Sequence, residues 1–407
     1  MKQIVINASI LFDGISKKEN VNIVIEDDKI IDISRNKLKP DFSGIVTPAF
    51  IDAHSHIGMD RQGEPSYESE VNDNSMHINP LNNPLNSIYF DDRAFEEAID
   101  FGVLYSCVVP GSGNLIGGRA LIIKNFAKNR DEALIKEYGY KFALGYNPRS
   151  TTEWKGERPN TRMGVYALLE NRFDSLITKV KKAEIEKKKK IKELEEKLNE
   201  KKITQDEKKE EEKIINEEFE VEFSSEDKAL LELLKGEKIA KVHVHKEDDI
   251  LYLIELVKKY NLKATADHTC DVFHKEIYDK LGENNIPVVF GPLGALDYKV
   301  ELKHSHYKNV RYLIQSKAFF GLMTDHPVIL TYNIRDTLKY FLIAGLKEEE
   351  AISIITYKNA KILGIDNILG TIEPGKKASL VVWDNSPFYF GAYPLAVIGE
   401  GKILRER

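Results

Sequence analysis

Six of the ten histidines of this chain occur in three closely spaced pairs. The pairs are His54 and His56, His243 and His245, and His304 and His306. Neutral imidazole is a good ligand for zinc and iron, and residues i and i+2 of a strand project from the same face. Each pair could therefore begin a metal site or could be two ordinary polar residues. The residues that precede and follow each pair distinguish these alternatives.

The pair at 54 and 56 follows the apolar run "GIVTPAF", which predicts a strand that delivers both imidazoles at its end. Three later apolar runs also end in possible ligands, namely "IAKV" before His243, "LKATA" before Asp-His268, and "FFGLM" before Thr-Asp325. Strand ends of this kind converge in a closed barrel. We therefore predict that His54, His56, His243, His268 and Asp325 form one metal site of nitrogen and oxygen ligands.

The remaining histidines of the pairs have weaker surroundings. His304 and His306 lie between "LDYKVELK" and "YKNVRYLI", a loop that leads into a helix, so we predict contact with substrate at most. His245 is predicted to contact substrate or to support a ligand. His326 follows Asp325 and is predicted to be a supporting residue.

Two cations could bind a carboxylate of the substrate. Arg162 in "NTRMG" and Lys299 in "DYKVE" are candidates for this role, and a structural ion pair is an equal alternative for each. The glycine-rich segment 110–118 could line the pocket by close backbone approach. It is not followed by Lys-Ser/Thr, so it does not predict a phosphate-binding loop.

The elements that must position these residues read as eight short apolar strands alternating with helices. The strands are expected within 44–54, 103–111, 119–125, 140–147, 239–245, 262–268, 286–292 and 319–325. Continuous apolar runs are typical of parallel strands that are covered on both faces. The pattern predicts an α/β fold with a (β/α)₈ TIM barrel, whose polar residues gather at the carboxyl ends of the strands.

Both ends of the chain have a different character. Residues 1–47 and 368–407 contain short alternating strands with Gly and Pro turns, and we expect them to pair into a small composite β-sandwich domain. The barrel would then occupy residues 48–367.

Residues 179–222 interrupt the barrel and consist almost entirely of Lys and Glu. A thin stripe of isoleucine and leucine, and a capping box formed by Thr204 and Glu207, predict a helical hairpin that projects from the barrel. The alternative is a solvated, partly disordered arm.

Composition excludes several classes of protein. The 407 residues are 42% hydrophobic and 30% charged, which allows a sizeable core, and the net charge of −6 argues against nucleic acid or an anionic membrane as partner. Only two cysteines are present, and we find neither a leader-like N-terminus nor an apolar stretch that could span a membrane. A cytoplasmic location is expected.

Several motifs resemble the amidohydrolase superfamily, most closely its imidazolonepropionase-related members. They are "TPAFIDAHSHIG", "PGSGNLIGG", "RPNTRMGVYALL", "KVHVHKEDDI", "TADHT", "VVFGPLG", "MTDHPV" and "IEPGKKASLVVWD". The resemblance implies that the five predicted ligands bind a divalent ion, most simply Zn²⁺, with Fe²⁺ or Mn²⁺ as alternatives. It further implies that Asp325 is the catalytic base, and that His268 or His245 stabilises the oxyanion.

The resemblance also implies a bridging Lys or Glu at the end of the third or fourth barrel strand, which permits two ions. Relatives have a Glu within "ALGYNPR", where this chain has Tyr146, and a phenol bridges cations poorly. Lys124 ends another strand and is a weaker candidate for the bridge. We therefore expect one ion rather than two.

The function implied is hydrolysis of an amide or cyclic amide C–N bond of a small molecule by a metal-activated water. Alternatives are a deaminase, for which Glu247 could donate the proton, another hydrolase of the superfamily, or a non-catalytic relative that binds partners through the helical hairpin. A homodimer is compatible with the resemblance.

Overall fold

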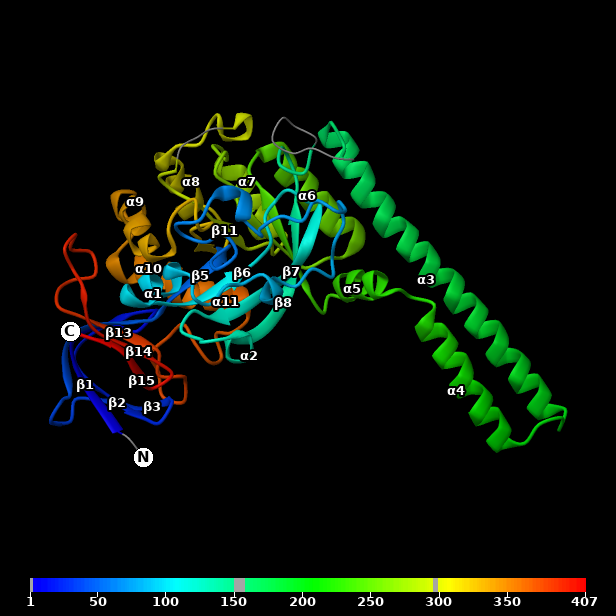
Figure 1. Cartoon of the computed structure of the whole chain (residues 1–407), viewed down its shortest axis with the longest axis horizontal. Helices are drawn as coiled ribbons and strands as arrows, with labels where there is room; N and C mark the ends of the chain where they lie inside the picture. The colour runs from blue at the N-terminus through cyan, green and yellow to red at the C-terminus, as the bar shows by residue number, and fades with distance from the viewer. Residues whose placement is uncertain (1–2, 150–157, 296–298) are drawn as a thin grey trace.

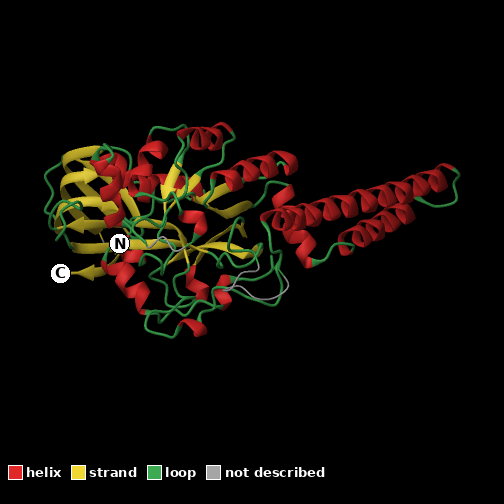
Figure 2. Ribbon diagram, turned by 90° about the horizontal axis from the view of Figure 1, so that it is seen from above, coloured by secondary structure: helices red, strands yellow, loops and turns green. Residues whose placement is uncertain are grey.

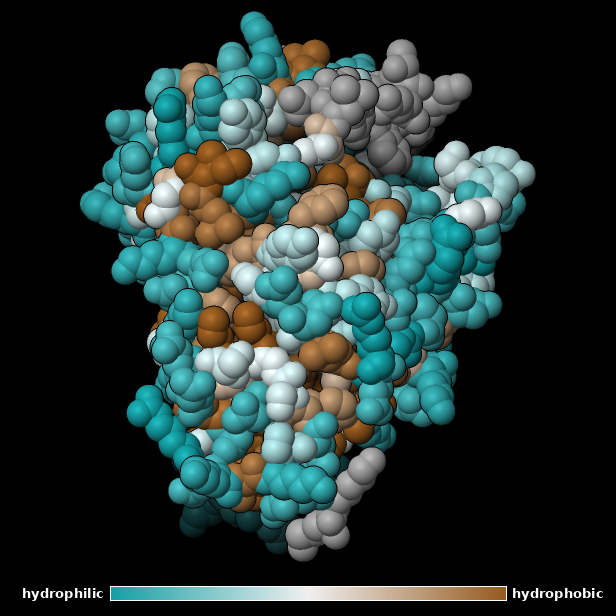
Figure 3. Space-filling model, turned by 90° about the vertical axis from the view of Figure 1, so that its left-hand side faces the viewer, coloured by the Kyte–Doolittle hydropathy of each residue, from teal (hydrophilic) through white to brown (hydrophobic). Residues whose placement is uncertain are grey.

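The computed structural model describes residues 3–149, 158–295 and 299–407, which form two β-sheets, a shell of helices and a projecting helical arm (Figure 1). The first and last strands lie together at one end of the molecule, away from the arm. Seen from that end, small groups of apolar side chains lie among hydrophilic ones (Figure 3), as is usual for a folded protein.

The smaller sheet has seven strands in the order β15-β14-β13-β4-β1-β2-β3. They are β1 (Gln3–Phe12), β2 (Lys17–Glu26), β3 (Lys29–Ser34), β4 (Phe42–Pro48), β13 (Leu380–Trp383), β14 (Pro394–Gly399) and β15 (Lys402–Glu406). Alternate apolar residues such as Ile4, Ile6 and Ala8 form a core separate from that of the barrel. Because β13 pairs with β4, strands from both ends join one continuous sheet rather than the two sheets of the predicted sandwich. The expected domain limits stay a prediction.

The larger sheet has eight strands in sequence order, and these correspond to the eight predicted runs. They are β5 (Phe50–Ser55), β6 (Val103–Val108), β7 (Ile116–Lys124), β8 (Leu134–Ala143), β9 (Ile239–Val244), β10 (Ala264–His268), β11 (Val288–Phe290) and β12 (Phe320–Leu322). Most of their residues are buried, because helices cover the outside and side chains fill the inside.

One strand departs from the predicted all-parallel barrel. β7 runs antiparallel to both β6 and β8, while the other paired neighbours in this sheet are parallel. The connections before and after β7, residues 109–115 and 125–133, are too short for the crossover that a parallel neighbour requires. The carboxyl end of β7 therefore points away from the mouth that the other strand ends share.

Side chains and a few backbone bonds close the barrel between β5 and β12. Asn359 is fully buried and donates to the carbonyl oxygens of Ile51 (2.6 Å) and Leu322 (2.8 Å), while its Oδ1 accepts from the Leu322 amide (3.0 Å). Nearer the mouth, the Asp325 amide donates to the His54 carbonyl (3.1 Å). These bonds fix the end of the last barrel strand against the first.

The helices around the barrel are short, apart from α6. They are α1 (Arg93–Asp100), α2 (Arg130–Ala133), α5 (Ser225–Leu234), α6 (Glu247–Tyr260), α7 (Lys275–Glu283), α8 (Val310–Ile314), α9 (Leu338–Ile343), α10 (Glu348–Ser353) and α11 (Asn359–Leu363). Of the described helices, none is long and apolar enough to cross a membrane.

The helical arm is formed by α3 (Arg162–Asn199) and α4 (Gln205–Val221) and extends well beyond the barrel (Figure 2). α3 begins earlier than the predicted insertion, because Val165, Leu169 and Phe173 recur at helical spacing and pack into the barrel core. Farther out, buried Leu194 and Ile215 belong to the arm itself. The predicted capping box at Thr204 is present.

Removing the outer arm is expected to leave the barrel folded. Residues 184–218 contribute none of the buried residues of the barrel core, and Ala183 and Phe219 line one groove between the two helices, so a short Gly/Ser linker can join them. We expect the melting temperature to change by less than about 4 °C, since roughly that shift corresponds to 1 kcal/mol in large domains. Differential scanning calorimetry of the shortened and full-length proteins checks this, and a much larger loss would show that the arm supports the barrel.

Candidate metal centre

The two histidines of β5 are held in defined tautomers. His54 Nδ1 lies 2.6 Å from Asp267 Oδ2, and His56 Nδ1 lies 2.7 Å from the Val109 carbonyl oxygen. Each Nδ1–H therefore donates away from the mouth, and each Nε2 is left to bind an ion, as is usual for metal-ligating histidine. Both side chains are buried, His54 within β5 and His56 directly after its last residue.

Asp325 completes the first group of donors. Its Oδ1 lies 3.4 Å from His54 Nε2 and 3.2 Å from His56 Nε2, and these three residues are close enough to hold one ion. Burial opposes its ionisation, but the hydrogen bond to His56 and the charges of His56, His54 and Lys141 together keep the pKa of Asp325 below its usual range. Asp325 has a positive φ of 54°, a conformation that non-glycine residues adopt mainly at turns and functional sites.

A second group of donors consists of His243, His245 and His268 at the ends of β9 and β10. His243 and His268 each have both ring nitrogens buried without a hydrogen-bond partner, and His245 has such an Nδ1. Burial lowers the pKa of His243 to about 4 and also lowers those of His245 and His268, so the rings are neutral near pH 7. Unpaired neutral imidazoles inside a protein fit a divalent ion, because coordination would satisfy the nitrogens.

Lys141 lies beside His54 of the first donor group and was not among the predicted site residues. Its Nζ is 2.8 Å from His54 Nε2, and the side chain is fully buried near the carboxyl end of β8. Burial lowers the pKa of Lys141 to about 8, and nearby Lys241 acts in the same direction. The signal was present in the sequence as a charge within the apolar run "YKFALGY", because lysine is rarely buried without a specific partner.

A second buried lysine, Lys241, contacts the carboxylate that orients His54 in the first donor group. Lys241 Nζ lies 2.8 Å from Asp267 Oδ2, the same oxygen that receives the His54 Nδ1–H. Thr265 donates to the other Asp267 oxygen at 2.7 Å. Asp267 is thus held in place from two sides, and it fixes the orientation of His54.

Asp52 links β5 to the segment that carries Asp325. Its carboxylate accepts the Thr324 amide at 3.1 Å and the Thr324 hydroxyl. Burial raises the pKa of Asp52 to about 7 in spite of these bonds. A protonated or half-protonated carboxyl group therefore lies directly beneath the donors.

This pKa makes the stability of the metal-free protein depend on pH. Because the folded-state pKa lies above the unfolded value of about 3.9, the stabilisation is complete below about pH 4 and is lost as the pH rises through about 7. We expect wild type to lose about 2.5 kcal/mol more than Asp52→Asn between pH 5 and 8. Urea unfolding in a chelator tests this, and parallel pH profiles of the two proteins would contradict it.

The two predicted anion clamps are both engaged by carboxylates. Arg162 begins α3 and pairs with Asp249 at 3.0 Å and Asp248 at 3.7 Å, which favours the structural ion pair over a role in substrate binding. Lys299 does line the cavity at the barrel mouth, but its Nζ also lies 3.3 Å from Glu301. A clamp at Lys299 would therefore bind its anion beside a carboxylate.

Glu301 places a carboxylate next to Tyr146, the residue that stands where a bridging Glu was expected. It is almost fully buried, its Oε2 accepts the Tyr146 amide at 2.8 Å, and its Oε1 lies 3.7 Å from His243 Nε2. Burial opposes its ionisation, but His243, His245 and Lys299 together lower the pKa of Glu301. The Tyr146 ring packs against the Arg149 guanidinium. Lys124, the weaker candidate for a bridge, pairs instead with Glu400 at the far end of reversed β7.

The other candidates take supporting positions. Glu247 binds the amides of Phe273 and His274, each at 2.9 Å, so its carboxylate holds the chain that leads into α7. This argues against the proton-donor role required by the deaminase alternative. His306 lines the cavity, as predicted for a residue that reaches substrate, and His326 accepts the Thr331 amide behind Asp325.

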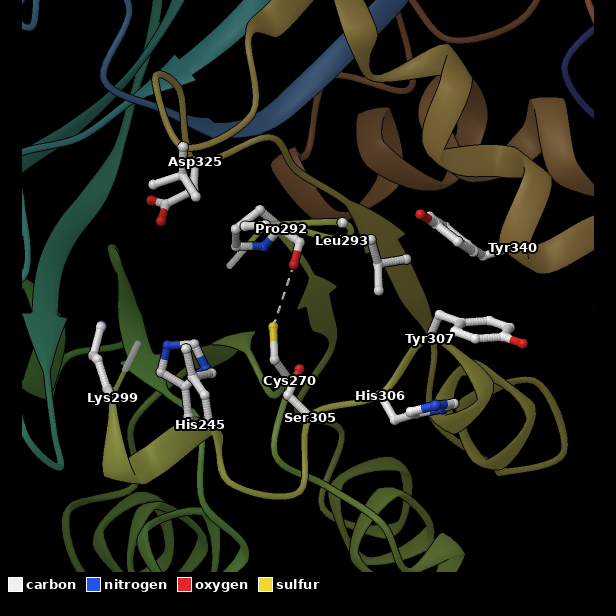
Figure 4. Close-up of a pocket in the computed structure, with 14 residues that line it drawn as sticks. His245, Cys270, Pro292, Leu293, Lys299, Ser305, His306, Tyr307, Asp325 and Tyr340 are labelled. Carbon is white, nitrogen blue, oxygen red and sulfur yellow. Dashed lines mark hydrogen bonds between the residues drawn. The ribbon is translucent and has the colours of Figure 1, made fainter. Parts of the chain in front are cut away.

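A cavity of ≈ 250 Å³ opens beside the two groups of donors (Figure 4). Asp325, His245 and Lys299 lie on one side of it, and Leu293 and Tyr340 lie on the other. A small molecule in this cavity would contact the donors directly.

Comparison with known proteins places this geometry in a family. The model of the amidohydrolase family matches residues 161–404, more than half of the chain. The chain belongs to the amidohydrolase family. The crystal structure of an amidohydrolase from Thermotoga maritima covers 99% of this chain and 100% of its own, with 29% identity and a TM-score of 0.84.

Two curated proteins also match, each over a limited part of its own length. Amidohydrolase tasK of Hapsidospora irregularis is 22% identical over 373 residues, which are 88% of this chain and 36% of that protein. Guanine deaminase of Escherichia coli is 30% identical over 121 residues, which are 28% of this chain and 26% of that protein. The matches thus span about a third or less of these relatives, while the Thermotoga amidohydrolase matches from end to end.

Proposed function

We propose that this amidohydrolase hydrolyses the C–N bond of a small amide or cyclic amide, other than a peptide bond, with two divalent ions bound at the barrel mouth. The observation that carries the proposal is the meeting of two donor groups beside a single cavity, whose wall includes Asp325 from one group and His245 from the other. Two groups support two ions rather than the single ion expected when Tyr146 was considered alone. Zn²⁺ suits the imidazole-rich set, with Fe²⁺ or Mn²⁺ as alternatives.

Bound divalent ions would polarise the amide carbonyl and make water acidic enough to attack it near neutral pH. Asp325 remains ionised and its Oδ1 faces both β5 histidines, so it is positioned to accept a proton from the attacking water. The same carboxyl group can then protonate the leaving nitrogen. His245, which lines the cavity with one unpaired ring nitrogen, is positioned to stabilise the developing oxyanion.

One chemical form of the Lys141 side chain, a carbamate, could bridge the two ions. An ammonium group cannot coordinate a cation, but a neutral amine can add CO₂, forming a carbamate and releasing a proton. The lowered pKa of Lys141 provides that neutral amine near pH 8. The carbamate would supply the bridging carboxylate that Tyr146 does not.

The experiment is metal reconstitution followed by assays on defined substrates. The protein is loaded with Zn²⁺, Mn²⁺ or Fe²⁺, and ions per chain are counted by elemental analysis. N-acetyl amino acids, five- and six-membered cyclic amides and dipeptides are then tested for release of a new amine, and guanine is tested for release of ammonia. We expect hydrolysis of non-peptide amides that requires the ion. Two bound ions with no amide cleaved would contradict the proposal, and ammonia release from guanine would support the deaminase instead.

A further inference from the structure

The cavity wall opposite Asp325 is apolar and aromatic. Tyr307 and Tyr340 lie there with ring centroids 5.7 Å apart and planes tilted by 39°, and Leu293 lies between them and the donors (Figure 4). Val328, whose amide donates to the Asp325 carbonyl at 2.9 Å, lines the cavity beside Asp325. We call Leu293, Tyr307 and Tyr340 the aromatic wall.

Neighbouring residues hold the Tyr307 ring in place. His306 stacks on it at 4.7 Å with an interplanar angle of 29°, and His306 Nδ1 accepts the Lys308 amide at 3.2 Å. Tyr307 nevertheless keeps 41% of its surface exposed. Apolar surface that is fixed in place and exposed inside a concave site is ready to be covered by a ligand.

We infer that the aromatic wall binds an aryl or branched alkyl group of the substrate, so that this enzyme acts on hydrophobic amides rather than on small polar ones. The inference rests on the proposed function for the bond that is cleaved. The wall is continuous with the donor groups, because Asp325 and His245 line the same cavity, so a group bound there lies next to the reacting carbonyl. The volume of ≈ 250 Å³ limits that group to roughly one ring or one branched chain.

Hydroxamic acids that differ only in their apolar group provide the test, because a hydroxamate chelates divalent ions and its affinity is measured separately from the turnover of an amide substrate. Binding of acetohydroxamate and phenylacetohydroxamate to the metal-loaded protein is measured by calorimetry. We expect the phenyl compound to bind at least about tenfold more tightly, since burying an aromatic ring contributes more than the free energy of a tenfold change.

Variants assign the difference to the wall. Tyr340→Ala and Leu293→Ala are expected to reduce the preference for the phenyl compound several-fold and to leave acetohydroxamate binding unchanged. Tyr340→Phe keeps the ring and should keep the preference. Tyr389→Ala, which removes a 58% exposed tyrosine outside the wall, is the matched control.

Each outcome decides the inference. Equal affinity for the two hydroxamates, no binding of either, or a preference that survives in both alanine variants overturns it. Failure of the proposed function is recognised separately, since it would appear as metal-loaded protein that binds hydroxamates but cleaves no amide. Cleavage of N-acetylglycine as fast as N-acetyl-L-phenylalanine would reject the aromatic wall and retain the hydrolase.

Discussion

Asp325→Asn is expected to lower kcat by about 10³-fold while leaving the fold intact, in the range by which general acid–base groups contribute. The amide has nearly the shape of the carboxylate and keeps an oxygen toward the β5 histidines, but it can neither accept nor return a proton. Asp325 faces His54 and His56 at 3.4 and 3.2 Å, so the loss falls on the reacting centre. Steady-state kinetics on the best amide substrate, together with elemental analysis, provide the measurement.

The matched control is Asp384→Asn, which removes a carboxylate paired with Arg407 and outside the site. It should retain wild-type kcat. An Asp325→Asn protein that keeps its ions and turns over at a rate near wild type would refute the catalytic role of Asp325.

Lys141→Met is expected to reduce turnover by at least about a hundredfold and to leave stability unchanged or raised. The activity falls because the residue beside His54 Nε2 no longer offers a ligand or a precursor of one. The stability does not fall because burying a charged amine is costly, and an apolar side chain of similar length removes that cost. Activity and stability should thus move independently.

Two further measurements separate a bridging carbamate from a simple positive charge at Lys141. Native mass spectrometry of the metal-loaded protein is expected to show one added CO₂, and acetate or bicarbonate should partly restore turnover in Lys141→Ala. Lys141→Arg keeps the charge and should remain inactive. Full activity in Lys141→Arg would reject the carbamate, and Lys124→Met at the far end of β7 should behave as wild type.

The strands and the first donor group were predictable because their signals are local. The apolar run before His54 and His56 predicts a strand end, and β5 indeed ends at Ser55 between them. His243, His268 and Asp325 could be assigned in the same way. Each predicted ligand lies at the end of an apolar run, and the convergence of strand ends is a property of the barrel rather than of any one segment.

What could not be predicted depends on contacts between distant parts of the chain. Arg162 meets Asp249, and Glu301 meets the Tyr146 amide, across separations that no sequence period reveals. The reversed direction of β7 is an intermediate case, since the short connections on either side of it were visible in the sequence. Lys141 could be recognised in the sequence as a charge inside an apolar strand. Its place in the candidate site, however, follows only from its contact with His54.

The arm has a consequence for how the size of this protein is measured in solution. α3 has 38 residues and is roughly 57 Å long at 1.5 Å per residue, and much of it projects from the barrel. Hydrodynamic drag follows the longest dimension, so a single chain of 46.5 kDa should diffuse and elute like a considerably heavier sphere. An elution volume typical of a dimer would thus be expected even from a monomer, and light scattering, which reports mass without reference to shape, is the appropriate measure of its assembly.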